Sequence, residues 1–572
     1  MRSGRAGASS SSRWGDRATH RVGSRLYVRY RAPTLRTALS QRSLLSQGLR
    51  RLEQLTAHRL APVVVFAVAL GVHSIRSIAW PVAAGPDLDD FLRYYVQIDD
   101  ADALLPASML TKTPLSPIVI GLSLDLVGGA LAEPLMALLF AGSVVAWYAA
   151  GLTFGPRVAI VTALALLLYP GYGEIFHEAA SEPVFAAGFA GWAVLVTRAA
   201  RRPSAARFAA VGLGVALLAL VRPGDQVLVA FALFPLILPG TWKRRLAWAG
   251  ALGGSCVVVL AAWAVHNGLR YGEYTVARGG QTALFHHAFV VDRIVQPENG
   301  PASRRLADAV RRHLLTREPY RSYGVTLDQV FSSGSLRISE DLGLLSDEVF
   351  GWSSSTLRDA GIEAVRAHLG KYASNVLKTI WLELSEPFYR IPPASGEPSP
   401  RPPETVVVGG QRLPHPGGGE LIPSGQSYWI SRPDRRIRLV WTSPTHWTYV
   451  FRDPRDKPRF EQIQRRMDEL FDNLPDRDGS AALSLRLNQL SRWYPRPIGW
   501  LGVGLLVLAL RRPRSSRTLL ALAASALLVI GVTALFAPTA LRYAIPVSPA
   551  FALLGVGALL GRRTEAVAAV GS

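Results

Sequence analysis

The sequence predicts an all-α polytopic membrane protein of about ten transmembrane helices, with a mixed α/β insert outside the membrane. Three observations predict this class. Apolar residues make up 49% of the 572 residues and come in long blocks. Arginine clusters separate several of these blocks, as they do in loops that stay on one side of a membrane. One long stretch, 266–495, is polar and contains no apolar block of spanning length.

The first 59 residues predict a basic, disordered cytoplasmic tail, because they hold thirteen Arg and only two acidic residues. Much of the remaining net charge of +22 lies in short loops between apolar blocks. No RNA- or DNA-binding motif accompanies it, so we expect no nucleic-acid partner. The single cysteine, Cys256, excludes an intrachain disulfide and a Cys-based zinc site. Only five of the 63 basic residues are Lys, which is typical of a GC-rich bacterium.

Ten apolar blocks are predicted to cross the membrane, seven in an N-terminal module (60–265) and three in a C-terminal module (496–561). The predicted spans are 60–80, 134–153, 157–171, 182–197, 206–221, 226–240, 245–265, 496–510, 517–537 and 543–561. Several are shorter than the roughly 20 residues of an untilted span. Residues 562–572 are predicted to be a second cytoplasmic tail.

The block 113–134 decides the topology. It contains Asp125 and a Gly pair, and burying an aspartate at mid-bilayer costs ~3 kcal/mol. If this block does not span, every basic loop from Arg157 onward falls on the side of the basic N-terminus, as the positive-inside rule requires. We therefore predict an outer juxtamembrane loop at 81–133, both termini in the cytoplasm, and 113–134 as an amphipathic or re-entrant segment on the outer face.

The first outer loop, GPDLDDFLRYYVQ, carries Asp87, Asp89 and Asp90 directly after the first span. One aspartate would be enough to cap a helix beginning near Leu88, for ~1 kcal/mol or less. Three like charges within four residues repel one another, and a shared site raises the affinity of one of them for a proton or a cation. The loop is therefore a candidate for a functional carboxylate as well as for a cap.

Further ionisable residues are predicted to reach the same outer face. The loop after the third span, YPGYGEIFHEAASEP, offers His177, Glu178 and Glu182, with Glu174 one turn earlier; a solvated helix cap is the alternative interpretation. Arginines at the ends of apolar helices either snorkel to headgroups or bind an anion such as phosphate. The candidate binding residues are Lys112, His177, Glu178, Glu182, Arg222, Asp225, Arg542 and Tyr543. No second His stands at ligand spacing from His177, so a metal site is only weakly indicated.

The polar insert 266–495 is predicted to be an extracytoplasmic domain. Residues 357–384 carry apolar positions at three- and four-residue steps, which predicts one amphipathic helix. After a Pro-rich linker, the segments ETVVVGG, SYWIS, RRIRLVW and HWTYVF are typical of short strands in a small sheet.

Taken in order, these motifs resemble those of the GT-C superfamily of membrane glycosyltransferases, in particular the branch of protein O-mannosyltransferases and aminoarabinose transferases. The resemblance covers roughly residues 60–290 and 496–561. It rests on the motifs GPDLDDFLRYY, KTPLSPIVIGL, YPGYGEIFHEAASEP, LVRPGDQ, HNGLRYGEYTVARGG and LRYAIPVSP. The first loop reads DLDD where many relatives have Asp-Glu, and the long insert matches nothing we can name.

The resemblance implies an enzyme that moves a hexosyl or pentosyl group from a polyprenyl-phosphate carrier to an acceptor on the outer face of a bacterial inner membrane, with inversion. It implies that Asp89 or Asp90 is the general base. Arg542, with Lys112 or Arg222, would stabilise the departing lipid phosphate. Residues Glu178, Glu182 or His177 would orient the sugar or bind a divalent cation, the one cofactor that the resemblance suggests. The acceptor is left open among lipid, protein and polysaccharide.

Two other classes fit parts of the pattern. A transporter or flippase places ionisable residues near the bilayer midplane, often in two similar halves, whereas these charges lie near one face and no repeat is visible. A non-catalytic protein of cell-envelope glycan assembly would use the insert to bind polymer and would need no carboxylate.

Overall fold

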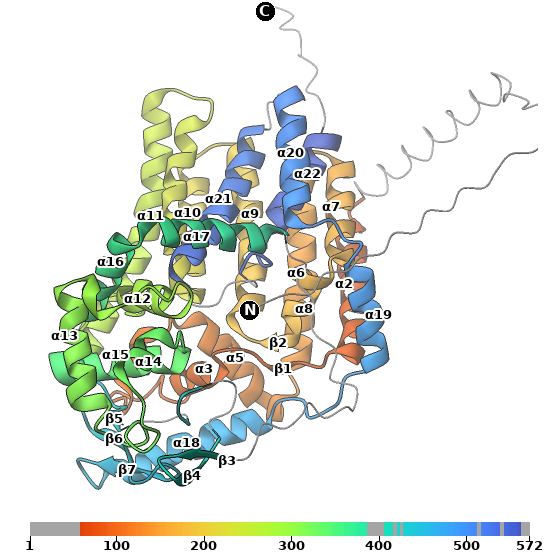
Figure 1. Cartoon of the computed structure of the whole chain (residues 1–572). Helices are drawn as coiled ribbons and strands as arrows, with labels where there is room; N and C mark the ends of the chain where they lie inside the picture. The colour runs from red at the N-terminus through yellow and green to blue at the C-terminus, as the bar shows by residue number, and fades with distance from the viewer. Residues whose placement is uncertain are drawn as a thin grey trace, which may run out of the picture. The chain divides into compact units, whose positions relative to one another are not determined.

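The computed structural model describes residues 58–385, 405–415, 420–423, 427–511, 516–537 and 543–561. Helices dominate these residues, and they form a bundle of apolar helices with the polar insert at one end (Figure 1). The predicted fold class, helical with a mixed α/β insert, is thus confirmed. We call the end of the bundle beside the insert the insert end and the opposite end the arginine end.

Each of the ten predicted spans is found as a helix. They are α2 (Ala61–Ala79), α6 (Ala132–Leu152), α7 (Pro156–Leu168), α9 (Ser181–Arg201), α10 (Ala205–Val221), η3 (Pro223–Ile237), α11 (Trp242–Tyr271), α20 (Pro497–Arg511), α21 (Ser516–Phe536) and α22 (Pro549–Leu560).

Within the described ranges, α2, α6, α9, α11 and α21 are long and apolar enough to cross a membrane alone. A sixth candidate is the pair formed by α7 and the segment Pro170–His177, which bends by 70°. The helices α10, η3, α20 and α22 are apolar but shorter. The last one begins six residues later than predicted, because Tyr543–Ser548 form turns ahead of Pro549. The number of crossings therefore stays a prediction.

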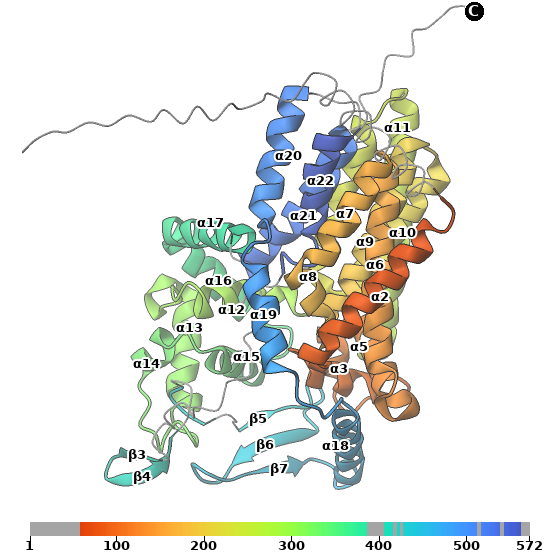
Figure 2. The same cartoon turned by 90° about the vertical axis from the view of Figure 1, so that its right-hand side faces the viewer.

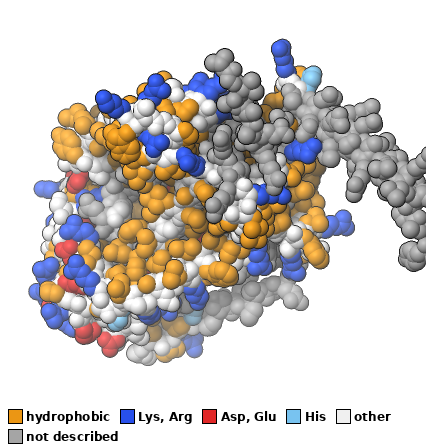
Figure 3. All heavy atoms as spheres, turned by 90° about the horizontal axis from the view of Figure 1, so that it is seen from above, with side chains coloured by type: hydrophobic (Ala, Val, Ile, Leu, Met, Phe, Trp, Pro, Cys, Tyr) orange, Lys and Arg blue, Asp and Glu red, His pale blue; other side chains and the backbone are white. Residues whose placement is uncertain are grey.

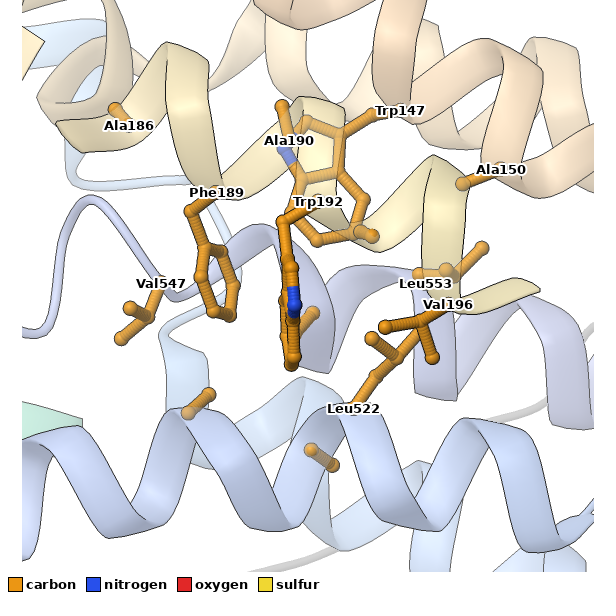
Figure 4. Packing of buried hydrophobic residues seen from close by; sticks show 14 of the residues in the cluster. Trp147, Ala150, Ala186, Phe189, Ala190, Trp192, Val196, Leu522, Val547 and Leu553 are labelled. Atoms are coloured by element: carbon orange, nitrogen blue, oxygen red, sulfur yellow. The ribbon is translucent and has the colours of Figure 1, made fainter. Parts of the chain in front are cut away.

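Close backbone approaches and aromatic side chains pack the bundle, as is usual for helices in lipid. A Cβ on Gly212 would lie 2.0 Å from the Leu252 carbonyl oxygen, so glycine lets α10 and α11 touch. In Figure 4, Trp147 of α6 lies beside Phe189 and Trp192 of α9. The Trp147 and Phe189 ring centroids are 6.1 Å apart. The buried Trp192 indole N–H donates to the Val211 carbonyl at 3.2 Å.

Four short helices follow α2: α3 (Leu88–Tyr95), α4 (Pro106–Thr111), α5 (Leu115–Asp125) and η1 (Leu126–Gly129). Figure 2 shows α3 and α5 at the insert end. At about 1.5 Å per residue, α5 reaches only about half of the bilayer core. The Asp125 carboxylate accepts the Tyr95 hydroxyl at 2.9 Å and pairs with Arg466 of α18 (Asp456–Asp472) in the insert. These partners support the prediction that 113–134 does not span.

The insert contains helices and two small sheets. Its helices are α12 (Gly280–Val290), η4 (Pro297–Asn299), α13 (Pro301–Ala309), η5 (Val310–Leu314), α14 (Leu327–Ser332), α15 (Leu336–Phe350), α16 (Thr356–Ala367), α17 (Leu369–Ser385), α18 and α19 (Ala481–Ser491). Strands β3 (Thr405–Val408) and β4 (Gln411–Pro414) form an antiparallel hairpin, and β5 (Tyr428–Trp429), β6 (Ile437–Trp441) and β7 (Trp447–Phe451) form an antiparallel sheet.

The prediction of one helix over 357–384 was wrong in one respect, because the chain breaks between α16 and α17. His368 leaves the helical conformation at φ −129° and ψ 36°. The two halves have different neighbours, α16 packing on α12 and α13 and α17 on α21 and α20. Figures 1 and 2 show α17 lying across the bundle rather than along it.

Candidate functional site

A two-residue bridge fixes the acidic loop beside the loop that follows the third span. Strand β1 (Ala83–Ala84) pairs in parallel with β2 (Glu178–Ala179), which follows α8 (Pro170–Glu174) and η2 (Ile175–His177). The next residue, Gly85, lies so close to the partner loop that a Cβ there would be 2.6 Å from the Ala180 Cβ. The loops that carry Asp87 and Glu182 are therefore held side by side.

Each of the three aspartates in the acidic loop pairs with a basic side chain. Asp87 and Asp90 each lie 3.3 Å from the Lys112 Nζ. Arg93 pairs with Asp89 at 2.8 Å and with Asp90 at 3.2 Å. Asp87 is the residue that precedes α3, but its side chain caps no amide and its backbone is left-handed, with φ 65°. Capping alone therefore does not explain Asp87.

Lys112 is the centre of this charge cluster. It follows α4, and only 20% of its side chain is exposed. Burial opposes its positive charge, but the carboxylates of Asp90 and Asp87 more than offset that effect and raise the pKa of Lys112. Lys112 thus stays protonated at neutral pH and places its positive charge between the two aspartates.

Arg222 lies at the junction of α10 and η3, where a Pro-Gly pair interrupts the helical path. Its guanidinium carbon lies 5.2 Å from the Phe185 ring centroid and 4.7 Å from that of Tyr543. Its Nε is 3.9 Å from an Asp225 carboxylate oxygen. Its buried Nη1 has no hydrogen-bond partner among the residues that the structure describes. The aromatic contacts orient the guanidinium and leave donors for a ligand.

A cavity of about 290 Å³ joins these two groups of residues. Its walls come from the start of α3, the loop between α4 and α5, the start of α9, the α10–η3 junction, α12, the end of α21, and Tyr543. The predicted site residues that line it are Asp87, Lys112, Glu182, Arg222, Asp225 and Tyr543. Phe91, Val221, Val532 and Phe536 add apolar surface. The cavity thus places three carboxylates, two cations and an apolar wall around one space.

Other predicted residues lie outside this cavity. Asp89 turns to Arg93, and 55% of its side chain is exposed. Asp90 does not line the cavity, but its carboxylate pairs with Lys112, which does. His177 is fully buried inside the bundle, where its ring stacks on that of His73 with centroids 4.3 Å apart. Glu178 belongs to β2 and does not line the cavity. Arg542 lies outside the described residues, so its position is not assigned.

The sequence reasoning missed Glu383, at the end of α17. Its carboxylate accepts the Ala544 amide at 2.8 Å, next to Tyr543 in the cavity wall. Burial raises the pKa of Glu383 to about 7, against the lowering effects of the Ala544 and Tyr543 amides and of Arg222. A lone acid in the last turn of an otherwise apolar helix face was the signal in the sequence. The insert also supplies Ala283 of α12 to the cavity wall.

A divalent cation stays an untested suggestion for this site. In the part of the chain that the structure describes, no three His, Cys, Asp or Glu side chains are grouped to hold a metal ion. Asp89 and Asp90, the closest candidates in sequence to Asp87, instead pair with Arg93 and Lys112.

Comparisons with known proteins do not assign this chain to a family. No protein-family model matches the chain, and no curated protein matches it. A search of solved structures finds similarity to the crystal structure of ArnT from Cupriavidus metallidurans bound to undecaprenyl phosphate. The match covers 88% of this chain and 78% of that one, with 15% sequence identity and a TM-score of 0.31. A TM-score this low is not enough to establish a shared activity.

Proposed function

We propose that the protein is an integral-membrane glycosyltransferase of the GT-C type that moves a sugar from a polyprenyl-phosphate carrier to an acceptor at the insert end of the bundle. The observation that carries this proposal is the cavity, in which Asp87 shares one space with Lys112 and Arg222. A base for the acceptor and cations for a phosphate are the two groups that such a transfer needs. The order of motifs in the sequence, which resembles the GT-C pattern, supports it independently.

In the proposed reaction, Asp87 accepts the proton of the acceptor hydroxyl as its oxygen attacks the anomeric carbon. The bond from that carbon to the phosphate oxygen breaks, and the electron pair leaves with the polyprenyl phosphate. A single in-line displacement of this kind inverts the sugar. Asp87 replaces Asp89 and Asp90 as the favoured base, because it lines the cavity and they do not. Asp90 acts as a positioning residue through Lys112.

Arg222 is the proposed phosphate ligand. Its Nη1 has no protein hydrogen-bond partner among the described residues, so it can donate to an oxygen whose charge grows in the transition state. Glu182 and Asp225 line the same cavity and would accept hydroxyl groups of the sugar. The apolar surface of Val532 and Phe536 would contact the first part of the lipid chain. Tyr543 would keep Arg222 in place.

The proposed orientation puts the insert end outside. The connections at the other end carry Arg157, the cluster 198–207 and the cluster 243–245, with no acidic residue among them, which is the cytoplasmic pattern. The protein would then be a multi-pass protein of a bacterial inner membrane with both termini cytoplasmic. On this proposal the parts 60–265, 266–495 and 496–561 have the roles expected from the sequence. The predicted tails 1–59 and 562–572 lie outside the described residues, apart from residues 58 and 59.

The two alternative functions, a transporter or flippase and a non-catalytic glycan assembly protein, are less well supported. In a transporter the ionisable residues would lie near the middle of the spans, whereas the buried His73 and Arg76 lie in the last two turns of α2, toward the insert end. A non-catalytic glycan assembly protein would not need a partly buried Lys112 between two carboxylates.

The test is replacement of one carboxylate. In a strain that lacks the gene, the wild-type protein should restore a surface glycan that mass spectrometry detects. We expect Asp87→Asn to reduce that product by roughly 10²- to 10⁴-fold, the usual contribution of a general base. Asp89→Asn makes the same chemical change two residues away, outside the cavity, and should keep most of the product. Full product from a correctly inserted Asp87→Asn protein would rule out the proposed base.

A further inference from the structure

A second and larger cavity lies at the arginine end, far from the chemistry proposed above. It has a volume of about 410 Å³ and opens between the end of α6, the end of α9 and the start of α10. Four arginines and three small or apolar residues line it: Ala149, Leu152, Thr153, Arg198, Arg201, Arg202 and Arg207. Figure 3 looks onto this end of the bundle, where Lys and Arg side chains are spread over the face and acidic ones gather at one margin.

The positive charge of this cavity has no carboxylate counter-charge among the residues that the structure describes. No acidic residue occurs between Glu182 and Asp225 in the sequence. None of the four arginines forms an ion pair with a carboxylate among the described residues. Four guanidinium groups around one space repel one another unless an anion or the solvent lies between them.

The loop between α9 and α10 holds one of the arginines in position. It is only three residues long, and Ser204 caps α10 by accepting the Arg207 amide at 3.3 Å. The Arg207 guanidinium also donates to the Arg202 carbonyl across the loop. This part of the site is therefore ordered before any ligand binds.

The positive-inside rule explains why arginines lie at this end, but not why some of them face an open cavity. Other arginines at the same end donate hydrogen bonds to the protein. Arg245 donates to the Leu236 carbonyl at 3.2 Å, and Arg517 donates to the Ile237 carbonyl at 2.8 Å. These two cap the end of η3 and would be needed whatever the lipid. Arg198 and Arg201 make no such side-chain hydrogen bond in the described part of the chain.

We propose that this cavity binds the headgroup of an anionic phospholipid. The arginines would hold the phosphodiester by bidentate hydrogen bonds, and Ala149 and Leu152 would contact the glycerol and the start of the acyl chains. Basic pockets between transmembrane helices at a membrane surface are suited to such headgroups. A free phosphate shares the charge but not the apolar contacts. The site is independent of the transfer reaction and of its carboxylates.

The experiment uses the full-length protein, delipidated in a neutral detergent and titrated with dioleoyl phosphatidylglycerol or dioleoyl phosphatidylcholine. Native mass spectrometry counts bound lipid, and thermal unfolding reports stabilisation. We expect the anionic lipid to bind at least about tenfold more tightly than the neutral one. Arg198→Gln with Arg201→Gln should remove that preference, whereas Arg198→Lys with Arg201→Lys should keep most of it.

A matched control removes the same charge elsewhere on the same face. Lys243→Gln with Arg244→Gln should leave the lipid preference unchanged, since neither residue lines the cavity. Equal losses in the two Gln pairs would overturn the proposal in favour of unspecific surface attraction. Inorganic phosphate that stabilises the protein as well as the anionic lipid does would overturn the assignment to a lipid. Because binding is measured directly, neither result depends on glycan transfer.

Discussion

Replacing Gly85 with alanine tests whether the β1–β2 bridge sets the geometry of the cavity. The added methyl carbon would lie 2.6 Å from the Ala180 Cβ and 2.9 Å from the Ala179 carbonyl oxygen. Carbon atoms in good contact are about 3.5–4.0 Å apart, so the two loops must separate by roughly 1 Å. Neither neighbour can turn aside, because one is the short side chain of Ala180 and the other is backbone.

The cost follows from the same geometry. Forcing a methyl group into a packed site costs about 1–3 kcal/mol. The bridge pairs only two residues on each side, and each hydrogen bond contributes about 1 kcal/mol, so the bridge is too weak to resist. The loop that carries Asp87 should then move away from the α9 loop. A misplacement of about 1 Å can lower a catalytic rate by about 10²-fold.

The assay combines glycan restoration in the deletion strain with thermal unfolding of the purified protein. Gly71→Ala is the control, because it adds the same methyl group inside α2 with no atom within 4 Å. It should stabilise the helix by about 0.5–1 kcal/mol and leave transfer unchanged. If Gly85→Ala transfers sugar and unfolds as the wild type does, the bridge does not position the site.

Three other perturbations give distinct outcomes. Arg222→Gln should lower transfer by about 10²- to 10³-fold, and Arg222→Lys by less, because a lysine keeps the charge but not the paired donors. Cysteine in place of Ser332 should react with an impermeant reagent from outside whole cells, and in place of Ala206 only after permeabilisation; the opposite pattern would reverse the orientation. Burial raises the pKa of Glu383 to about 7 in the native state. As pH falls from 7 toward 4.5 the native state binds this proton before the unfolded state does, so the free energy of unfolding should rise. Glu383→Gln should flatten that part of the pH profile of thermal unfolding.

The sequence could predict the parts of this fold that depend on local pattern. The apolar blocks predicted the positions of all ten helices of the bundle, since a spanning helix must be apolar along its length. Arg222 was found because a charge next to an apolar helix is conspicuous. The three aspartates were found for the same reason, but their order of importance was not, because only the fold decides which one Lys112 and the cavity wall approach.

Other features depend on tertiary contacts that no local pattern records. Apolar spacing continues across His368, so nothing in the pattern marks the break between α16 and α17. His177 appeared to belong to an outer loop, but the segment after α7 bends by 70°, and the His177 ring is buried against His73. Glu383 stood alone in an amphipathic helix, and only the placement of α17 across the bundle brings it to the Ala544 amide.

The contributions of Ala283 and Glu383 mean that the insert is not a removable appendage. Its α12 forms part of the cavity wall, and its α17 ties the turn before α22 to the rest of the chain. A chimaera that exchanges 266–495 for the corresponding segment of another protein would therefore leave an incomplete chamber, even with every span in place. If the proposed transfer is correct, changes of acceptor preference would have to arise by small steps within this insert rather than by wholesale substitution.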